Sequence, residues 1–168
     1  MGQGGEEAGR RILGGKEWHR ETRSRIFWDL TERVIGACIE VHRWLGPGLL
    51  ESVYEACVCH ELGARGMAYE RQRSLPVTYK GVSLECGYRI DLVVERQLLV
   101  ELKCVGELMP IHEAQILTYL KLTGLHVGLL VNFNTPTLRH GIRRLVRHVI
   151  PAASAETERD PARGPGAP

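Results

Sequence analysis

Two carboxylates and an ammonium group lie within a short stretch of the chain, at Asp91, Glu101 and Lys103. They belong to two apolar runs that are separated by a tight connection. Two carboxylates that are held close together repel each other, unless one is protonated or a cation is recruited. Carboxylate oxygens suit Mg²⁺ or Mn²⁺, which keep open positions for phosphate oxygens. These residue types therefore indicate metal-dependent chemistry at a phosphate group.

The alternation of apolar and polar residues predicts how the two runs pair. In each run the apolar side chains share one face of a strand, and this face carries Tyr88, Ile90, Leu92, Val94, Leu98, Val100 and Leu102. If residues 95–97 form a three-residue hairpin loop, Val94 pairs with Leu98, and Asp91 lies directly across from Glu101. Directly opposed side chains have Cβ atoms about 5 Å apart. A two-residue loop would place a carboxylate on the apolar face, so the pattern excludes it.

Lys103 follows Glu101 by two residues, so both side chains share a face, roughly 6.6 Å apart along the strand. Beside a bound metal, Lys103 can orient or deprotonate an attacking water, or stabilise the charge that develops on the phosphate. The alternative interpretation is a solvated strand face with an ordinary Glu/Lys pair. The opposed carboxylate of Asp91 favours the site over the solvated face.

A helix is predicted to start at Pro110 and carries Gln115 and Tyr119 one turn apart, with His112 on the same stripe. A short loop joins this helix to the strand of Glu101, so the stripe can pack toward the carboxylates. Gln115 would then bond to the water or the phosphate, and Tyr119 would contact the backbone or a base. The alternative is an ordinary polar pair at the boundary of the core.

The wider pattern predicts one folded domain over residues 26–149, between disordered tails over residues 1–25 and 150–168 that are poor in apolar residues. The first helix is expected to begin at Asp29, where Glu32 completes a capping-box spacing, and to end at Gly46-Pro47-Gly48. Further helices are expected over residues 49–64 and 110–122, and strands over 75–79, 83–94, 98–104 and 126–132. Residues 135–149 are expected to form a final helix or an irregular turn.

Composition is that of an ordinary globular domain. The chain has 168 residues, 43% of them hydrophobic and 25% charged, which suits a single core. It has no apolar run long enough to span a bilayer and no signal pattern at its N-terminus, so we expect a cytoplasmic protein without membrane contact. The five cysteines lie mostly in apolar elements, which favours reduced thiols over a disulfide framework.

A basic cluster lies near the C-terminal end of the predicted domain. It consists of Arg139, His140, Arg143, Arg144, Arg147 and His148. The net charge is only +2, so the molecule as a whole does not attract nucleic acid strongly. A local contact with nucleic acid through Arg139, Arg143, Arg144 and Arg147 is one interpretation, and a solubilising face is the other.

The order of these elements resembles the PD-(D/E)xK nuclease superfamily, in particular its branch with a Gln-x-x-x-Tyr helix. The residues that carry the resemblance are Asp91, Glu101-Leu102-Lys103 and Gln115-x-x-x-Tyr119. The segment Gly48-Leu49-Leu50-Glu51-Ser52-Val53-Tyr54 is similar to the signature of the GxxExxY protein family. Further matching segments are Val41-His42, Gly46-Pro47-Gly48, Tyr88-Arg89-Ile90-Asp91, Gln115-Ile116-Leu117-Thr118-Tyr119-Leu120 and Asn132-Phe133. One departure is Ile90, which stands where the founding pattern has proline.

The resemblance implies a restriction-endonuclease-like core of the α/β (α+β) class, with the order α-α-β-β-β-α-β and a mixed sheet flanked by helices. It also implies that Asp91, Glu101 and Glu51 bind Mg²⁺ or Mn²⁺. Lys103 would act on the water, and Gln115 would support the site. Without the resemblance, Glu51 would be read only as a favourable charge at a helix N-terminus. The residues expected to support the shape of the site are Tyr54, Tyr119, His42 and His112.

We therefore expect a divalent-metal-dependent nuclease that acts on DNA, in DNA processing or in defence against foreign DNA. The alternative is a catalytically silent module of the same fold that binds nucleic acid or protein. The complete set of Asp91, Glu101 and Lys103 argues against this silent module. A glycoside hydrolase that uses Asp91 and Glu101 would leave Lys103 unexplained. The oligomeric state has no signal in the sequence, and a homodimer stays an open alternative.

Overall fold

A five-stranded mixed sheet forms the centre of the protein, in the order β1-β4-β5-β6-β7. The computed structural model describes residues 15–85 and 87–147, with side chains from Trp28 onward. The strands of this sheet are β1 (Tyr69–Ser74), β4 (Arg89–Val94), β5 (Leu98–Lys103), β6 (Val127–Asn132) and β7 (Ile142–Val146). Of these described strands, only β5 and β6 pair in parallel, and the other neighbours are antiparallel.

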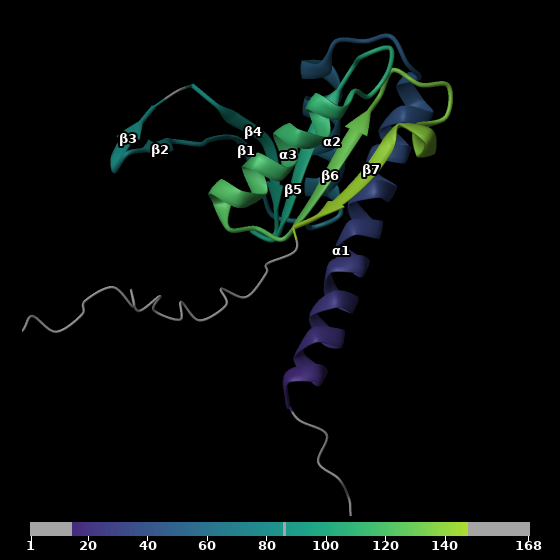
Figure 1. Cartoon of the computed structure of the whole chain (residues 1–168). Helices are drawn as coiled ribbons and strands as arrows, with labels where there is room; N and C mark the ends of the chain where they lie inside the picture. The colour runs from purple at the N-terminus through teal and green to yellow at the C-terminus, as the bar shows by residue number, and fades with distance from the viewer. Residues whose placement is uncertain (1–14, 86, 148–168) are drawn as a thin grey trace, which may run out of the picture.

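Helices cover both faces of the sheet, as Figure 1 shows. They are α1 (Gly15–Leu45) and α2 (Glu51–Ala64) on one face and α3 (Pro110–Thr123) on the other. A hairpin of β2 (Val77–Tyr79) and β3 (Val82–Leu84) projects away from the sheet, and a short 3₁₀ helix, η1 (Leu138–Gly141), precedes β7. The expected mixed sheet flanked by helices is confirmed. Within the described residues, no helix combines the length and apolarity that a membrane crossing requires.

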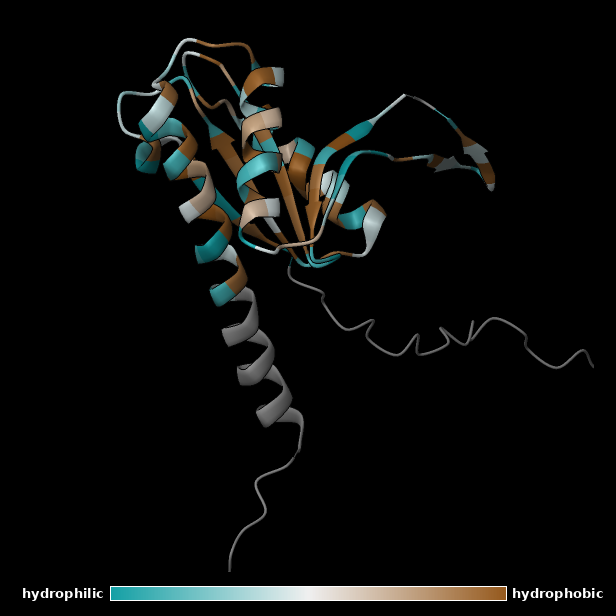
Figure 2. Cartoon of the chain, turned by 180° about the vertical axis from the view of Figure 1, so that it is seen from behind, coloured by the Kyte–Doolittle hydropathy of each residue, from teal (hydrophilic) through white to brown (hydrophobic). Residues whose placement is uncertain are grey.

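The core has two layers, one on each side of the sheet, and Figure 2 shows the strands as largely hydrophobic. The layer under α1 and α2 includes Val34, Cys38, Val58, Leu62, Leu92, Val100, Leu129 and Val131. The layer under α3 includes Val93, Leu99, Ile116, Leu120 and Leu130. Both faces of the sheet are therefore covered by helices. The carboxylates of β4 and β5 consequently do not lie on an uncovered face.

The first helix differs from the expectation. It begins at Gly15, well before Asp29, so the predicted helix start and capping box at Asp29 are wrong. Residues 15–25, assigned to the N-terminal tail from their composition, are helical. The rest of that tail, and the C-terminal tail at 150–168, lie outside the described residues.

The turn between α1 and α2 follows the expectation from Gly46-Pro47-Gly48. Gly46 and Gly48 have φ angles of +65° and +100°, which side chains with a Cβ rarely adopt. The reversal brings the first turn of α2 back over the sheet, with Glu51 as its acidic residue.

Three predictions of secondary structure need correction. The segment 69–74 was not expected to be a strand, yet it forms β1 at one edge of the sheet. The segment 83–94 is two strands, β3 and β4, because the chain leaves the hairpin before it joins the main sheet. Residues 135–149 form no α-helix over their described part; they contain η1 and β7 at the other edge. Both edge strands are rich in arginine, so they lack the apolar alternation that marks a strand.

The hairpin of β4 and β5 has the predicted register. Val94 pairs with Leu98, and Leu92 pairs with Val100. The turn has Glu95 and Arg96 at φ angles of +50° and +55°, so two residues other than glycine take the left-handed conformation.

The predicted face is wrong for one residue of β4. Ile90 packs in the layer under α3, whereas Leu92 packs in the layer under α1 and α2. The pairing of β1 with β4 is interrupted opposite Asp91, at Gln72, which has a φ angle of +51°. The alternation of faces in β4 is thus broken at Asp91, between Ile90 and Leu92.

Candidate active site

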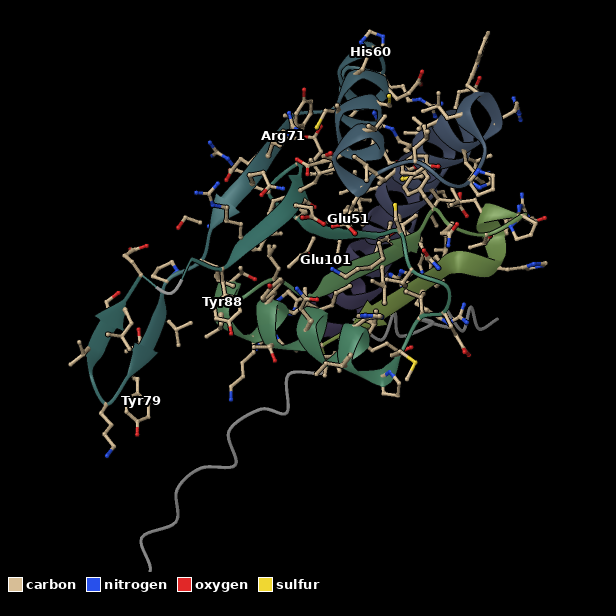
Figure 3. The ribbon with its side chains drawn as sticks, turned by 90° about the horizontal axis from the view of Figure 1, so that it is seen from above. Glu51, His60, Arg71, Tyr79, Tyr88 and Glu101 are labelled. Carbon is tan, nitrogen blue, oxygen red and sulfur yellow. The ribbon has the colours of Figure 1, made fainter. Side chains whose placement is uncertain are left out.

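Four elements bring the candidate residues to one end of the sheet. Asp91 comes from β4, Glu101 and Lys103 from β5, Glu51 from the first turn of α2, and Gln115 from α3. Figure 3 shows Glu51 and Glu101 beside each other between α2 and α3. The charge of Glu51 is close enough to contribute to the raised pKa of Glu101.

Glu101 is the centre of this cluster. The residue is only 2% exposed. Its Oε1 accepts hydrogen bonds from Lys103 Nζ at 2.7 Å and from Gln115 Nε2 at 3.0 Å. Its Oε2 is buried and has no hydrogen-bond partner among the described residues. The Glu101/Lys103 pair is therefore not a solvated strand face, and one carboxylate oxygen remains free for a ligand.

Asp91 is held from two sides. Its Oδ2 accepts a hydrogen bond from the backbone N–H of Leu102 at 2.8 Å, and its Oδ1 accepts one from Gln72 Nε2 at 3.3 Å. Gln72 Nε2 also donates to Glu55 Oε2 at 2.7 Å. Arg71 forms an ion pair with the same carboxylate of Glu55, which is 6% exposed. A network therefore connects α2 and β1 to the candidate metal ligand on β4.

Burial raises the pKa of each carboxylate in the cluster. The pKa of Glu101 rises to about 7, because burial and the charge of Asp91 outweigh the opposing effect of Lys103. Burial also raises the pKa of Asp91 and of Glu51, although Lys103 opposes both shifts. For Lys103, burial acts to lower the pKa, but its hydrogen bond to Glu101 and the surrounding carboxylates raise it overall. The site therefore has more negative charge than its single ammonium group can balance.

The residues fit a divalent cation. The unpartnered, buried Oε2 of Glu101 is an acceptor that lacks a donor, and a cation would satisfy it. Asp91 and Glu51 can supply further oxygens, which are the ligands that Mg²⁺ and Mn²⁺ prefer. In the part of the chain that the structure describes, no three acidic, histidine or cysteine side chains already form a ligand cluster. Water and substrate oxygens would therefore have to complete the coordination.

The helix α3 lies against β6 closely enough to aim Gln115 at Glu101. Gly128 allows this approach, since a Cβ there would lie 2.6 Å from Ile116 Cγ2. Gln115 Nε2 also bonds to the hydroxyl of Tyr119 at 2.8 Å. The predicted stripe therefore reaches the carboxylates through Gln115 and Tyr119. His112 lies elsewhere: its Nδ1 accepts a hydrogen bond from the N–H of Met109 and caps α3.

Tyr54 and His42 hold the segments around the site and do not reach its carboxylates through a described contact. The hydroxyl of Tyr54 donates to the carbonyl of Gly46 at 2.5 Å and accepts from the N–H of Leu49 at 3.2 Å. Its ring stacks on Phe133 at 4.4 Å. His42 Nε2 lies 2.9 Å from the carbonyl of Thr135. Tyr54 thus fixes the turn that presents Glu51.

The predicted arginine cluster is divided between different surroundings. Arg139 and Arg143 are exposed, on η1 and β7. The guanidinium of Arg144 lies over the ring of Trp28, 4.0 Å from its centroid, and burial lowers its pKa. Arg147 donates from Nε to the carbonyl of Leu125 at 3.3 Å. β7 is separated from the β5 carboxylates by β6.

Three residues near the carboxylates were not anticipated in these roles. Gln72 and Arg71 lie on the unpredicted strand β1, so nothing in the sequence placed them beside the site. Asn132, at the end of β6, bonds to both backbone groups of Val105 and so fixes the chain just after Lys103. Two signals could have suggested a role: its place at the end of a buried apolar run, and the resemblance of Asn132-Phe133 to the family.

Replacing Gln72 by alanine is expected to lower the free energy of unfolding by about 1–3 kcal/mol, because Glu55 and Asp91 lose the donor that they share. The measurement is urea unfolding of the metal-free protein. Gln97→Ala is the matched control, since Gln97 is exposed in the β4–β5 turn. Equal stabilities of the two variants would show that the Gln72 bridge is not formed.

Comparison with known proteins agrees with this arrangement. The profile of the PD-(D/E)XK nuclease superfamily matches residues 28–145, from within α1 to the last residue but one of β7. No curated protein and no solved structure matches the chain. The matched region includes the carboxylates, the lysine and the α3 glutamine. The chain therefore belongs to the PD-(D/E)XK nuclease superfamily.

Proposed function

We propose that this protein is a divalent-metal-dependent nuclease that hydrolyses phosphodiester bonds in DNA, in DNA processing or in defence against foreign DNA. The observation that carries the proposal is the buried Glu101, which has one free oxygen and lies next to the ammonium group of Lys103. Membership of a nuclease superfamily supports the reaction class, and the choice of DNA over RNA follows the resemblance described above.

Each residue of the site has a distinct role in this proposal. Asp91, Glu101 and Glu51 would hold Mg²⁺ or Mn²⁺, which when bound supplies Lewis-acid stabilisation of the phosphate and acidifies water. Lys103 keeps its ammonium proton beside Glu101 and can orient the attacking water or stabilise negative charge on the phosphate. Gln115 fixes the Glu101 carboxylate by donating to its Oε1, so the free Oε2 keeps one direction.

A narrower assignment, to the GxxExxY protein family, is also part of the proposal. The signature glutamate would be Glu51 and the signature tyrosine Tyr54. The positions of both residues support this assignment physically: Tyr54 bonds to Gly46 and Leu49, and this turn presents Glu51 near Lys103 and Asp91.

Exposed Arg139 and Arg143 are the basic residues that we propose as contacts for the nucleic acid backbone. The free thiols of the four described cysteines support a reducing, cytoplasmic location.

The proposal predicts cleavage of DNA that requires Mg²⁺ or Mn²⁺ and stops in EDTA. The assay incubates the full chain with circular double-stranded DNA, linear double-stranded DNA and single-stranded DNA, and with RNA of the same sequence. Cut circles would identify an endonuclease, whereas products from linear ends alone would identify an exonuclease. Cleavage that continues unchanged in EDTA would contradict the proposed use of a metal.

A silent binding module of the same fold is the second candidate. The observation that favours it is the lack of a ready-made cluster of three ligand side chains within the described ranges. Calorimetric titration with Mn²⁺ separates the two. If the wild type releases or absorbs heat on binding Mn²⁺ and Glu101→Ala does not, the site binds metal as the nuclease proposal requires. If the wild type shows no heat of binding, the silent module is supported.

A further inference from the structure

A groove of about 510 Å³ opens between α3 and the base of the β2–β3 hairpin. Its walls include Tyr88, Ile111 and Leu122, and Gln115, Thr118 and Tyr119 contribute polar atoms. A mostly apolar groove with a few polar groups is the usual form of a ligand site. Among the residues that the structure describes, no acidic side chain lines it.

The groove adjoins the candidate active site through a shared side chain, Gln115. Gln115 lines the groove and also donates to Glu101 Oε1 at 3.0 Å. The hydroxyl of Tyr119, another lining residue, accepts from the same amide nitrogen. A ligand in the groove therefore lies one side chain away from the carboxylate that would bind the metal.

The groove presents an aromatic ring that the fold leaves accessible. Tyr88 is 52% exposed, and its ring meets that of Tyr119 edge to face, with centroids 6.3 Å apart. Figure 3 shows Tyr88 beside α3, at the base of the hairpin that carries Tyr79. The apolar side chain of Ile111 on α3 is 69% exposed. An exposed ring with an apolar neighbour is a suitable platform for a flat ligand.

We propose that this groove binds an unpaired base of the strand that is cut, with the base stacked on Tyr88. This inference rests on the proposed nuclease function and specifies its substrate as nucleic acid with unpaired nucleotides. The neighbouring phosphate then lies toward Glu101 and Lys103. Gln115, Thr118 and Tyr119 offer hydrogen bonds to the edge of the base.

The charges around the groove favour nucleic acid as the occupant. Lys80, in the turn of the hairpin, lies over the ring of Tyr79, 5.4 Å from its centroid. Arg89, next to Tyr88 in β4, is exposed and makes no ion pair with any residue that the structure describes. Both cations lie outside the lining of the groove, Lys80 at the tip of the hairpin and Arg89 at the start of β4, where they can contact phosphates of the strand beyond the stacked base. Aromatic side chains with cations nearby are the arrangement with which proteins bind single strands.

The test measures binding without cleavage. The background is full-length Lys103→Ala with Mg²⁺, and the probes are a labelled single-stranded oligonucleotide and the duplex of the same sequence. In this background, Tyr88→Ala is expected to weaken binding of the single strand on the order of tenfold, whereas Tyr88→Phe retains the ring and the affinity. The duplex is expected to bind more weakly than the single strand, and Tyr88→Ala is expected to leave duplex binding unchanged. Tyr69→Ala is the matched control, because Tyr69 is 39% exposed and does not line the groove.

Two outcomes overturn the inference. One is equal affinity of Tyr88→Ala and the Lys103→Ala background for the single strand. The other is a wild-type dimer that Tyr88→Ala dissociates without changing nucleic acid binding, because the groove would then be an interface between copies. Failure of the nuclease proposal gives a different result: the wild type would not cleave any nucleic acid, whereas the Tyr88-dependent binding would remain.

Discussion

Replacing Lys103 by alanine is expected to lower the rate of metal-dependent cleavage by about a hundred- to a thousandfold. Within the described residues, the ammonium group is the one positive charge that hydrogen-bonds to Glu101, and we expect it to act on the water or the phosphate. Its side chain is 14% exposed, so little solvent screens this charge. The measurement is the initial rate of DNA cleavage at saturating Mg²⁺.

Lys121→Ala controls for the general loss of a lysine, because Lys121 is exposed on the last turn of α3. Its cleavage rate is expected to equal that of the wild type. Urea unfolding of Lys103→Ala checks that the variant is folded at the assay temperature. A folded Lys103→Ala with the wild-type rate would remove Lys103 from the mechanism.

Replacing Glu101 by glutamine is expected to abolish metal binding and, at the same time, to stabilise the metal-free protein. A pKa that rises from 4.5 to about 7 on folding corresponds to roughly 3 kcal/mol, which the folded state loses when Glu101 ionises. Glutamine has nearly the same shape and no charge, so the variant avoids this cost. We therefore expect a gain in free energy of unfolding of up to about 3 kcal/mol above pH 7.

The pH dependence gives this prediction a definite sign. Between pH 4.5 and about 7 the folded protein keeps the Glu101 proton while the unfolded chain releases it. The free energy of unfolding of the wild type should therefore fall as the pH rises through this window, whereas Glu101→Gln lacks this loss. Below pH 4.5 the carboxyl is neutral in both states, and the two proteins should become similar in stability.

Urea unfolding in EDTA across this pH range tests the stability, and calorimetry with Mn²⁺ tests the binding. Glu107→Gln is the matched control, because Glu107 is exposed in the loop before α3. It is expected to change neither quantity. A Glu101→Gln variant that is less stable than the wild type at every pH would show that the glutamate is held by a partner that glutamine cannot replace.

The hairpin that carries the carboxylates was predictable because its signal is local. The alternation of apolar residues set the face of Glu101, and the length of the loop set the pairing of Val94 with Leu98. The contact of Gln115 with Glu101 could also be predicted from the sequence, because a short loop joins β5 to α3. Such features depend on residues that are near each other in the sequence.

The network behind Asp91 was not predictable for the opposite reason. Glu55 meets Gln72 only because α2 packs beside β1, and β1 itself is a strand only through its pairing with β4. Its side chains are charged or polar and all but the half-buried Gln72 are exposed, so no periodicity marks them. The left-handed backbone of Gln72 and the place of Ile90 in the other layer likewise depend on tertiary contacts.

The arginines on the two edge strands of the sheet affect how readily the protein aggregates at high concentration. β1 carries Arg71 and Arg73, and β7 carries Arg143 and Arg144. An open strand offers its backbone to strands of other molecules, and charged side chains along it hinder that contact. The same residues that hid these strands from pattern recognition thus protect the protein from aggregation and fibril growth.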